Sequence, residues 1–171
     1  RLDQLLRLVG GSQRGQCLRR GEHDTRPPFL GRQGAQVRDQ LRLVGSDAAA
    51  ALETLVPMDV IDLAVGKQRY ALFTNAAGGI QDDLMIARRA DDLFVVVNAA
   101  CKDADTKHLM TNISHRCQVI PMPERALLAL QGQHAVNALQ RLAPGVEKLT
   151  FMTGGSFTLA GAECFVTRSG Y

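Results

Sequence analysis

The chain has 171 residues, of which 46% are hydrophobic and 22% are charged, values typical of an ordinary soluble globular domain. No apolar run approaches the roughly 20 residues that a membrane-spanning helix needs, and the first residues are too polar for a signal peptide. We therefore expect a cytoplasmic protein that has no membrane partner.

The net charge of +3 originates in the N-terminal segment. Residues 1–40 hold eight Arg, no Lys and four acidic residues, whereas the rest of the chain holds twelve basic and thirteen acidic residues. Pro27-Pro28 and six glycines interrupt any periodicity there. We expect this segment to be either a disordered basic arm or DNA translated in a wrong frame, and residues 41–171 to form the folded domain. Phe29 is its single aromatic residue, so a nucleic-acid partner is not expected.

The first half of the folded part reads as strands with one helix. Alternation predicts a strand over 41–44, and Ser46 is the expected N-cap of a helix over 47–55. Two further strands are predicted around a turn at residues 76–79, and a third, buried strand follows them. These three strands are Gln68–Thr74, Ile80–Arg88 and Leu93–Val97.

The second half alternates helices and short strands. The predicted helices are 102–113, with Leu109, Met110 and Ile113 on its inner face, and 133–142. The predicted strands are 119–120, 126–130, 148–153, 156–160 and 162–167. The fold class we expect is α+β, an antiparallel sheet with helices packed on one face.

No metal site is predicted. The four cysteines are scattered and form no Cys-x-x-Cys pair, and only His115 and Cys117 lie close together. Reduced thiols fit a cytosolic compartment. The histidines on the predicted helices, His108 and His134 among them, are expected to be surface or hydrogen-bonded residues.

Polar residues interrupt the apolar strands between Leu72 and Ala100. Asp82 and Asp83 stand beside a diglycine turn, where a carboxylate either points into a cleft and serves chemistry or lies at a solvated strand end. Asn98 follows a buried valine run, so its amide needs partners. These partners are either backbone groups at the strand end or the polar atoms of a bound heterocycle.

Four short motifs in this region carry a family resemblance. Thr74-Asn75, Gly78-Gly79, Asp82-Asp83-Leu84 and Val97-Asn98-Ala99 resemble, in this order, the folate-binding region of the T-protein of the glycine cleavage system, the aminomethyltransferase family. Residues 126–135 and Arg168-Ser169-Gly170-Tyr171 resemble two later blocks of that family. The resemblance covers roughly residues 41–171, which it marks as a truncated folate-binding domain.

The resemblance implies transfer of a one-carbon unit. Such an enzyme takes the aminomethyl group from the lipoyl arm of the H-protein, releases ammonia and passes a methylene to tetrahydrofolate. Tetrahydrofolate is then the expected cofactor and the lipoylated H-protein the expected partner. Asp83 matches the family's acidic residue near the reactive end of the folate, where it implies an electrostatic stabiliser and proton acceptor, with Asp82 facing away. The implied folate-binding residues are Asp83, Val96, Asn98, Tyr70 and Tyr171.

The chain also departs from the family pattern. The Thr-Gly-Glu that follows Gly-Tyr and the C-terminal half of the enzyme are missing, and Gln133 replaces a proline. The resemblance thus implies an N-terminal fragment that need not be active alone. Two alternatives stay open: the folate-binding domain of a flavoenzyme similar to sarcosine and dimethylglycine dehydrogenases, and a non-catalytic folate-binding protein.

Overall fold

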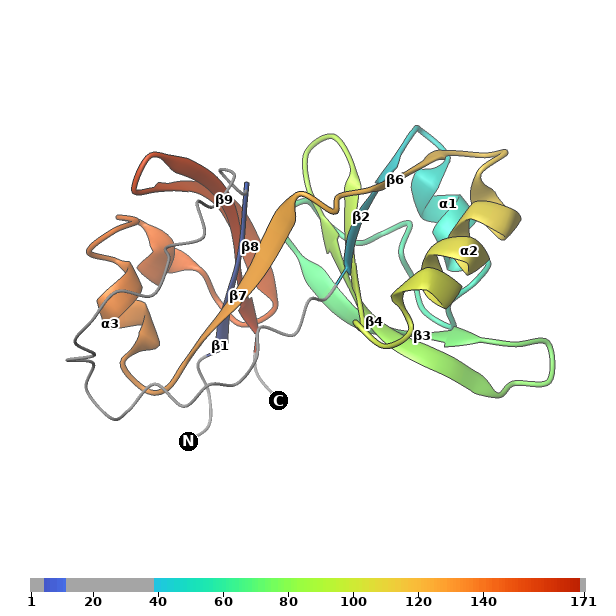
Figure 1. The fold of residues 1–171 in the computed structure, drawn as a ribbon, viewed down its shortest axis with the longest axis horizontal. Coiled ribbons are helices and arrows are strands. Elements are labelled where there is room, and N and C mark those ends of the chain that lie inside the picture. The colour runs from blue at the N-terminus through green and yellow to red at the C-terminus, as the bar shows by residue number, and fades with distance from the viewer. Residues whose placement is uncertain (1–4, 12–38, 170–171) are drawn as a thin grey trace, which may run out of the picture.

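The computed structural model describes residues 5–11 and 39–169, which fold into two antiparallel sheets and a few helices (Figure 1). The strands are β1 (Leu5–Gly11), β2 (Asp39–Val44), β3 (Gln68–Thr74), β4 (Ile80–Arg88), β5 (Leu93–Val97), β6 (Gln118–Pro121), β7 (Arg125–Gln131), β8 (Thr153–Leu159) and β9 (Ala162–Ser169). The helices are α1 (Ala48–Glu53), α2 (Lys102–Ile113), α3 (Ala135–Leu139) and the 3₁₀ helix η1 (Val146–Lys148).

The strands pair in two separate sheets. The five-stranded sheet has the order β3-β4-β5-β2-β6 and the four-stranded sheet the order β7-β1-β9-β8, and neighbours in both are antiparallel. In Figure 1, α1 and α2 lie against the five-stranded sheet, on the side away from the four-stranded one. The α+β class with an antiparallel sheet is confirmed, although the strands divide into two sheets where we expected one.

The central strand β5 is buried on both faces. Leu93, Val95 and Val97 belong to the core beneath α1 and α2, together with Leu109 and Ile113 of α2. Its other two side chains, those of Phe94 and Val96, pack against Phe165 of β9 in the four-stranded sheet. Strand β5 therefore lies between the helices and the second sheet, as a continuous apolar run predicts.

The turn between β3 and β4 is built by an asparagine and a glycine. Asn75 Oδ1 accepts hydrogen bonds from the backbone N–H groups of Ala77 (3.0 Å) and Gly79 (2.9 Å). Gly78 adopts a φ of 79°, which a side chain would disfavour. The predicted turn is confirmed, and it brings β4 back along β3 so that Asp82 comes opposite Phe73.

Two predicted helices are shorter than expected. Helix α1 begins at Ala48 with Asp47, and not Ser46, in the N-cap position. Helix α3 spans Ala135–Leu139, whereas the sequence predicted 133–142. The Gly132 backbone, with a φ of 122°, turns the chain just before this helix, and Pro144 lies beyond its end.

The strand predicted over residues 148–153 is wrong. Gly145 adopts a φ of 96° and starts the 3₁₀ helix Val146–Lys148, after which the chain turns again at Met152, with a φ of 59°. Only Thr153 of that stretch belongs to a strand. The apolar residues of this stretch alternate because they pack on the small core around α3. Val146 belongs to this core and Leu149 packs against it.

One strand lies inside the segment for which no fold was predicted. Residues 5–11 form β1, which pairs with β7 on one side and β9 on the other, and β2 already begins at Asp39. The prediction used the composition of all forty residues, which concealed the short run of leucine and valine in β1. Residues 12–38, to which the prediction of a disordered or misread segment mainly applied, lie outside the described residues.

Candidate functional site

Four of the five predicted folate-binding residues lie on one face of the five-stranded sheet. Directly opposed residues of neighbouring strands share a face, as do alternate residues along one strand. Leu72 is opposite Asp83, and Met85 is opposite both Tyr70 and Val96. Asn98 comes one position beyond the Leu84–Val97 pair, which aligns it with Asp83. The shared face is the one turned away from α1 and α2.

The Asn98 amide joins both adjacent carboxylates. Its Nδ2 donates to Asp83 Oδ1 (2.8 Å), Asp82 Oδ1 (3.0 Å) and the backbone oxygen of Asp83 (3.2 Å). All three partners are pure acceptors, which fixes this end of the amide as the NH₂ group. The donor side of Asn98 is therefore engaged within the protein, and Oδ1 is the atom that it can offer to a ligand.

Asp82 points to the opposite face, toward α2. It lies opposite Phe73, which is fully buried in the core under the helices. Burial raises the pKa of Asp82, but hydrogen bonds from Asn98, the Asp83 backbone, Asp105 and Cys101 outweigh it and hold this pKa below its usual value. Asp82 is thus an ionised group that faces the helix layer, away from Asp83.

Asp105 of α2 meets Asp82 from the helix side. Asp105 is only 5% exposed. Burial, the hydrogen bond to Asp82 and repulsion from Asp82 and Asp83 raise the pKa of Asp105 to about 7. Sequence reasoning missed this residue, although its spacing was informative. Asp105, Leu109 and Ile113 stand four residues apart and share the inner face of α2, whereas Met110, predicted inward, is 40% exposed.

Cys101 and His108 complete the polar surroundings of this carboxyl pair. The hydrogen bond to Asp82, burial and the nearby carboxylates raise the pKa of the Cys101 thiol. Burial lowers the pKa of His108, whose ring stacks edge-on against Phe73 with 5.2 Å between ring centroids. Neither group is therefore charged at neutral pH. Within residues 5–11 and 39–169, no three His, Cys, Asp or Glu side chains gather in a way that could hold a metal ion.

The remaining predicted folate-binding residues differ in accessibility. Tyr70 is 49% exposed, whereas Val96 is only 6% exposed and belongs to the core between the sheets. Val96 thus offers a ligand its backbone more readily than its side chain. Tyr171 lies outside the described residues. A cavity of about 10 Å³ on the same face is lined by Gln68, Met85, Ala87, Phe94, Val96, Leu127 and Thr167.

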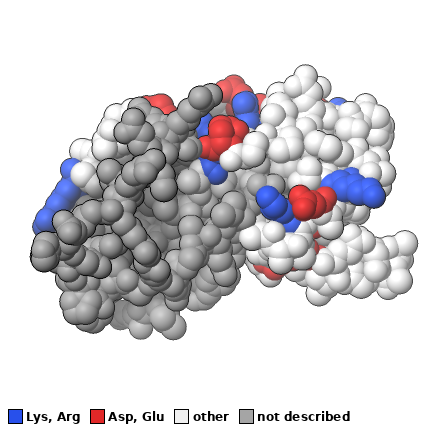
Figure 2. All heavy atoms as spheres, in the orientation of Figure 1, with Lys and Arg blue, Asp and Glu red and all other residues white. Residues whose placement is uncertain are grey.

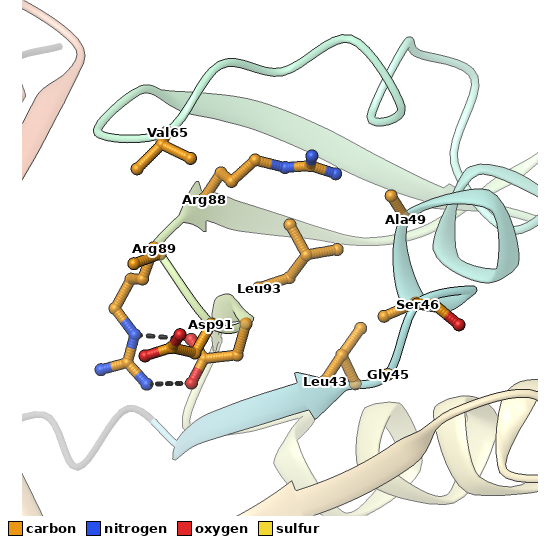
Figure 3. Close-up of a pocket in the computed structure, with 12 residues that line it drawn as sticks. Leu43, Gly45, Ser46, Ala49, Val65, Arg88, Arg89, Asp91 and Leu93 are labelled. Carbon is orange, nitrogen blue, oxygen red and sulfur yellow. Dashed lines mark hydrogen bonds and ion pairs between the residues drawn. The ribbon is translucent and has the colours of Figure 1, made fainter.

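A larger cavity of about 180 Å³ lies at the other end of the sheet (Figure 3). It contains none of the predicted site residues. In Figure 3 the Arg88 side chain extends along one side of it, and the dashed lines from the Arg89 guanidinium mark its two hydrogen bonds to the Asp92 carboxylate. There Asp92 accepts hydrogen bonds from Arg89 and from Arg42, each guanidinium Nε at 2.6 Å. This end of the sheet is an ion-paired structural element.

Comparisons with known proteins identify the family. Residues 35–171 match the sequence model of the GCVT N-terminal domain, so the chain belongs to the family of the glycine cleavage T-protein. It is 37% identical over 142 residues to the mitochondrial aminomethyltransferase of Dictyostelium discoideum and 40% identical over 141 residues to that of Flaveria anomala. The human mitochondrial aminomethyltransferase is 36% identical over 140 residues. Each alignment covers 77% of this chain.

A solved structure agrees with these sequences. The glycine cleavage aminomethyltransferase T of Bartonella henselae superposes with a TM-score of 0.65 at 29% identity, covering 80% of this chain and 40% of that one. The chain spans only 34–35% of the length of the three relatives. None of the described helices is long and apolar enough to cross a membrane.

Proposed function

We propose that this chain provides the folate-facing N-terminal part of an aminomethyltransferase of the glycine cleavage system. The reaction transfers a methylene unit from the aminomethyl-lipoyl arm of the H-protein to tetrahydrofolate and releases ammonia. The observation that carries the proposal is the Asn98 amide, which holds the Asp83 carboxylate on the sheet face that also carries Tyr70. Names of the relatives support the reaction class.

Asp83 is suited to stabilising positive charge. As the carbon–sulfur bond to the lipoyl arm breaks, sulfur takes the bonding electron pair and the N–CH₂ unit becomes positively charged and iminium-like. A fixed carboxylate near this charge lowers the barrier. The Asn98 bond over 2.8 Å fixes one Asp83 oxygen, which leaves the other oxygen to face the reacting atoms. The same oxygen is a proton acceptor for the attacking folate nitrogen.

The polar atoms on this face fit a pterin. Asn98 Oδ1 and the second Asp83 oxygen are acceptors, and a reduced pterin carries ring and exocyclic N–H donors. Tyr70, half exposed on the same face, offers an aromatic surface for ring contact. When bound, tetrahydrofolate supplies the nucleophilic nitrogen that receives the one-carbon unit. Val96 and Tyr171 remain proposed contacts on the strength of the family resemblance.

The partner and the compartment are proposals of the same kind. On the face shown in Figure 2, the described basic and acidic side chains lie beside one another and do not separate into two regions. This distribution suits a transient contact with the lipoylated H-protein, in which the lipoyl arm carries the specificity. We keep the cytoplasm as the proposed compartment; fractionation of cells expressing a tagged protein tests it.

The proposed function is tested with a charge-removing variant. Asp83→Asn is expected to reduce formation of methylenetetrahydrofolate from aminomethyl-lipoyl H-protein by about a hundredfold, the size of a lost electrostatic stabiliser. The assay uses the complete polypeptide that the gene encodes. Asp91→Asn, which removes an exposed carboxylate from the distant β4–β5 turn, is the matched control. Equal rates for the two variants would show that Asp83 has no role in the transfer.

A further inference from the structure

We propose that Asp105 is a positioning residue for Asp83: its carboxyl group donates a hydrogen bond to Asp82, and this bond keeps the Asn98 amide aligned on both Asp82 and Asp83. The inference extends the proposed function to the helix side of the sheet. Asp105 has no direct access to a ligand on the Asp83 face, because it approaches the sheet from α2, on the other side.

Two buried carboxylate oxygens that lack a hydrogen-bond donor among the described residues indicate that Asp105 is protonated. Asp82 Oδ2 and Asp105 Oδ2 are both buried, and neither accepts a bond from an amide or a hydroxyl in the described part of the chain. Two buried carboxylates in contact repel one another and leave these oxygens without donors. A proton on one of them converts the contact into an O–H···O⁻ hydrogen bond, which is a strong type of bond.

The surrounding groups place that proton on Asp105. Asp82 and Asp83 face it from β4, and Cys101 borders the pair from the loop before α2. His108, one turn further along α2, is kept neutral by burial. Among residues 5–11 and 39–169, no Lys or Arg shifts the pKa of Asp105. Because Asp82 already accepts bonds from Asn98 and from the Asp83 backbone, Asp82 is the better-stabilised anion.

Loss of the proton has a defined consequence for the site. Above pH 7, Asp105 ionises and repels Asp82, since no Lys or Arg in the described part of the chain offsets the second charge. Asp82 Oδ1 then shifts relative to Asn98, whose one NH₂ group is shared between Asp82 and Asp83. The Asp83 carboxylate loses its fixed orientation, and the transfer rate falls.

The first test follows Asn98 itself and needs no folate. The side-chain ¹⁵N–¹H signals of Asn98 in the full chain are recorded by NMR between pH 6 and pH 9. In the wild type we expect them to be dispersed and slowly exchanging at pH 6 and to shift or broaden through pH 7. In Asp105→Asn, whose amide donates permanently to Asp82, they are expected to stay unchanged across this range; in Asp105→Ala they are expected to be averaged at every pH.

The second test uses turnover by the complete polypeptide. We expect Asp105→Ala to lower kcat about tenfold with little change in the folate KM, because geometry and not binding is lost. Asp105→Asn is expected to restore kcat and to abolish its decline above pH 7, which a merely structural role would not do. Asp103→Asn, an exposed acid on the same helix, is the control and keeps the wild-type pH profile.

The two tests separate the two proposals. Wild-type protein without any folate-dependent transfer contradicts the proposed function, while the NMR titration still decides the role of Asp105. If the side-chain signals of Asn98 change neither with pH nor in Asp105→Ala, the positioning role of Asp105 is overturned, even when the enzyme is active. The same holds if Asp105→Asn keeps the wild-type decline of kcat above pH 7.

Discussion

Asn98, one residue beyond β5, faces Asp83 of β4, and a single amide nitrogen of Asn98 bonds to the carboxylates of both Asp83 and Asp82. These two carboxylates point to opposite faces of the sheet. The asparagine therefore links the face on which we place folate with the face that packs against α2. A change on the helix side reaches the proposed reaction site through one side chain.

Asn98→Ala removes this link. We expect the free energy of unfolding to fall by about 1–3 kcal/mol, because two acidic groups lose a charge-assisted partner. The transfer rate is expected to fall about tenfold or more, since Asp83 loses its orientation. Urea unfolding and the transfer assay measure the two effects. Asn137→Ala, at an exposed position of α3, is the control; the assignment fails if both variants behave alike.

Asp105→Asn is expected to stabilise the fold at alkaline pH. The folded pKa of Asp105, about 7, lies above the usual value of an aspartate, so ionisation of this group opposes folding. Stability from this carboxyl is lost as the pH rises from the unfolded pKa through the folded one. At pH 8 the variant should gain on the order of 2 kcal/mol, whereas at pH 4 it should match the wild type. A variant that gains nothing at pH 8 would show that folding does not raise the pKa of Asp105.

Asp92 is expected to control stability on the acid side. Burial raises its pKa, but hydrogen bonds and charge from Arg89 and Arg42 outweigh burial and lower it. A depressed pKa stabilises the folded state above the unfolded pKa, and this stability is lost as the pH falls through the folded pKa. Asp92→Asn should therefore destabilise the protein by about 2–4 kcal/mol at pH 7, since two arginines lose their partner.

The comparison for Asp92 is made at low pH. The stabilities of wild type and Asp92→Asn in denaturant titrations should converge as the pH falls through the lowered pKa of Asp92 and the wild-type carboxylate becomes protonated. Asp91→Asn, whose carboxylate is exposed in the same turn, should follow the wild-type curve throughout. Parallel curves for wild type and Asp92→Asn over the whole range would contradict the prediction.

Gly154 is expected to tolerate no side chain. A Cβ at this position of β8 would lie 2.9 Å from Phe165 Cζ and 2.9 Å from Thr167 Cγ2, both on the neighbouring strand β9. Because Phe165 also packs against Phe94 of the other sheet, its ring has little room to move. Gly154→Ala should cost about 1–3 kcal/mol, a typical cost of overpacking. Gly155→Ala, whose nearest neighbour is Phe157 Cε2 at 3.3 Å, should cost less.

Much of the five-stranded sheet could be predicted because its patterns are local. The Asn-x-x-Gly-Gly turn and the apolar run 93–97 define β3, β4 and β5 with their observed bounds, and alternation along β4 separates Asp82 from Asp83. The family resemblance indicated Asp83 and Asn98 as a site, and the structure shows that they touch. Their roles in folate binding and transfer remain predictions.

The remaining features depend on contacts between distant residues. The division into two sheets follows from the pairing of β1 with β7 and β9, whose partners lie more than a hundred residues away. Asp105 was not singled out from the sequence, because an acid near a helix start usually lies on the surface. Asp105 comes next to Asp82 and Asp83 only when α2 packs on β4, and a local sequence pattern does not reveal this contact.

The two-sided burial of β5 has a consequence for how the chain avoids misfolding. A strand that is apolar on both faces gains about as much from burial when it is misaligned by one residue, so hydrophobicity alone does not select its partner positions. The polar groups at its two ends make that selection: Arg42 and Arg89 hold Asp92 before the strand, and Asn98 meets Asp83 after it. A misaligned hairpin would separate both sets and bury unpaired charges. Asn98 and Asp83, which we place at the reaction site, thus also help to select the correct pairing of β4 with β5 during folding.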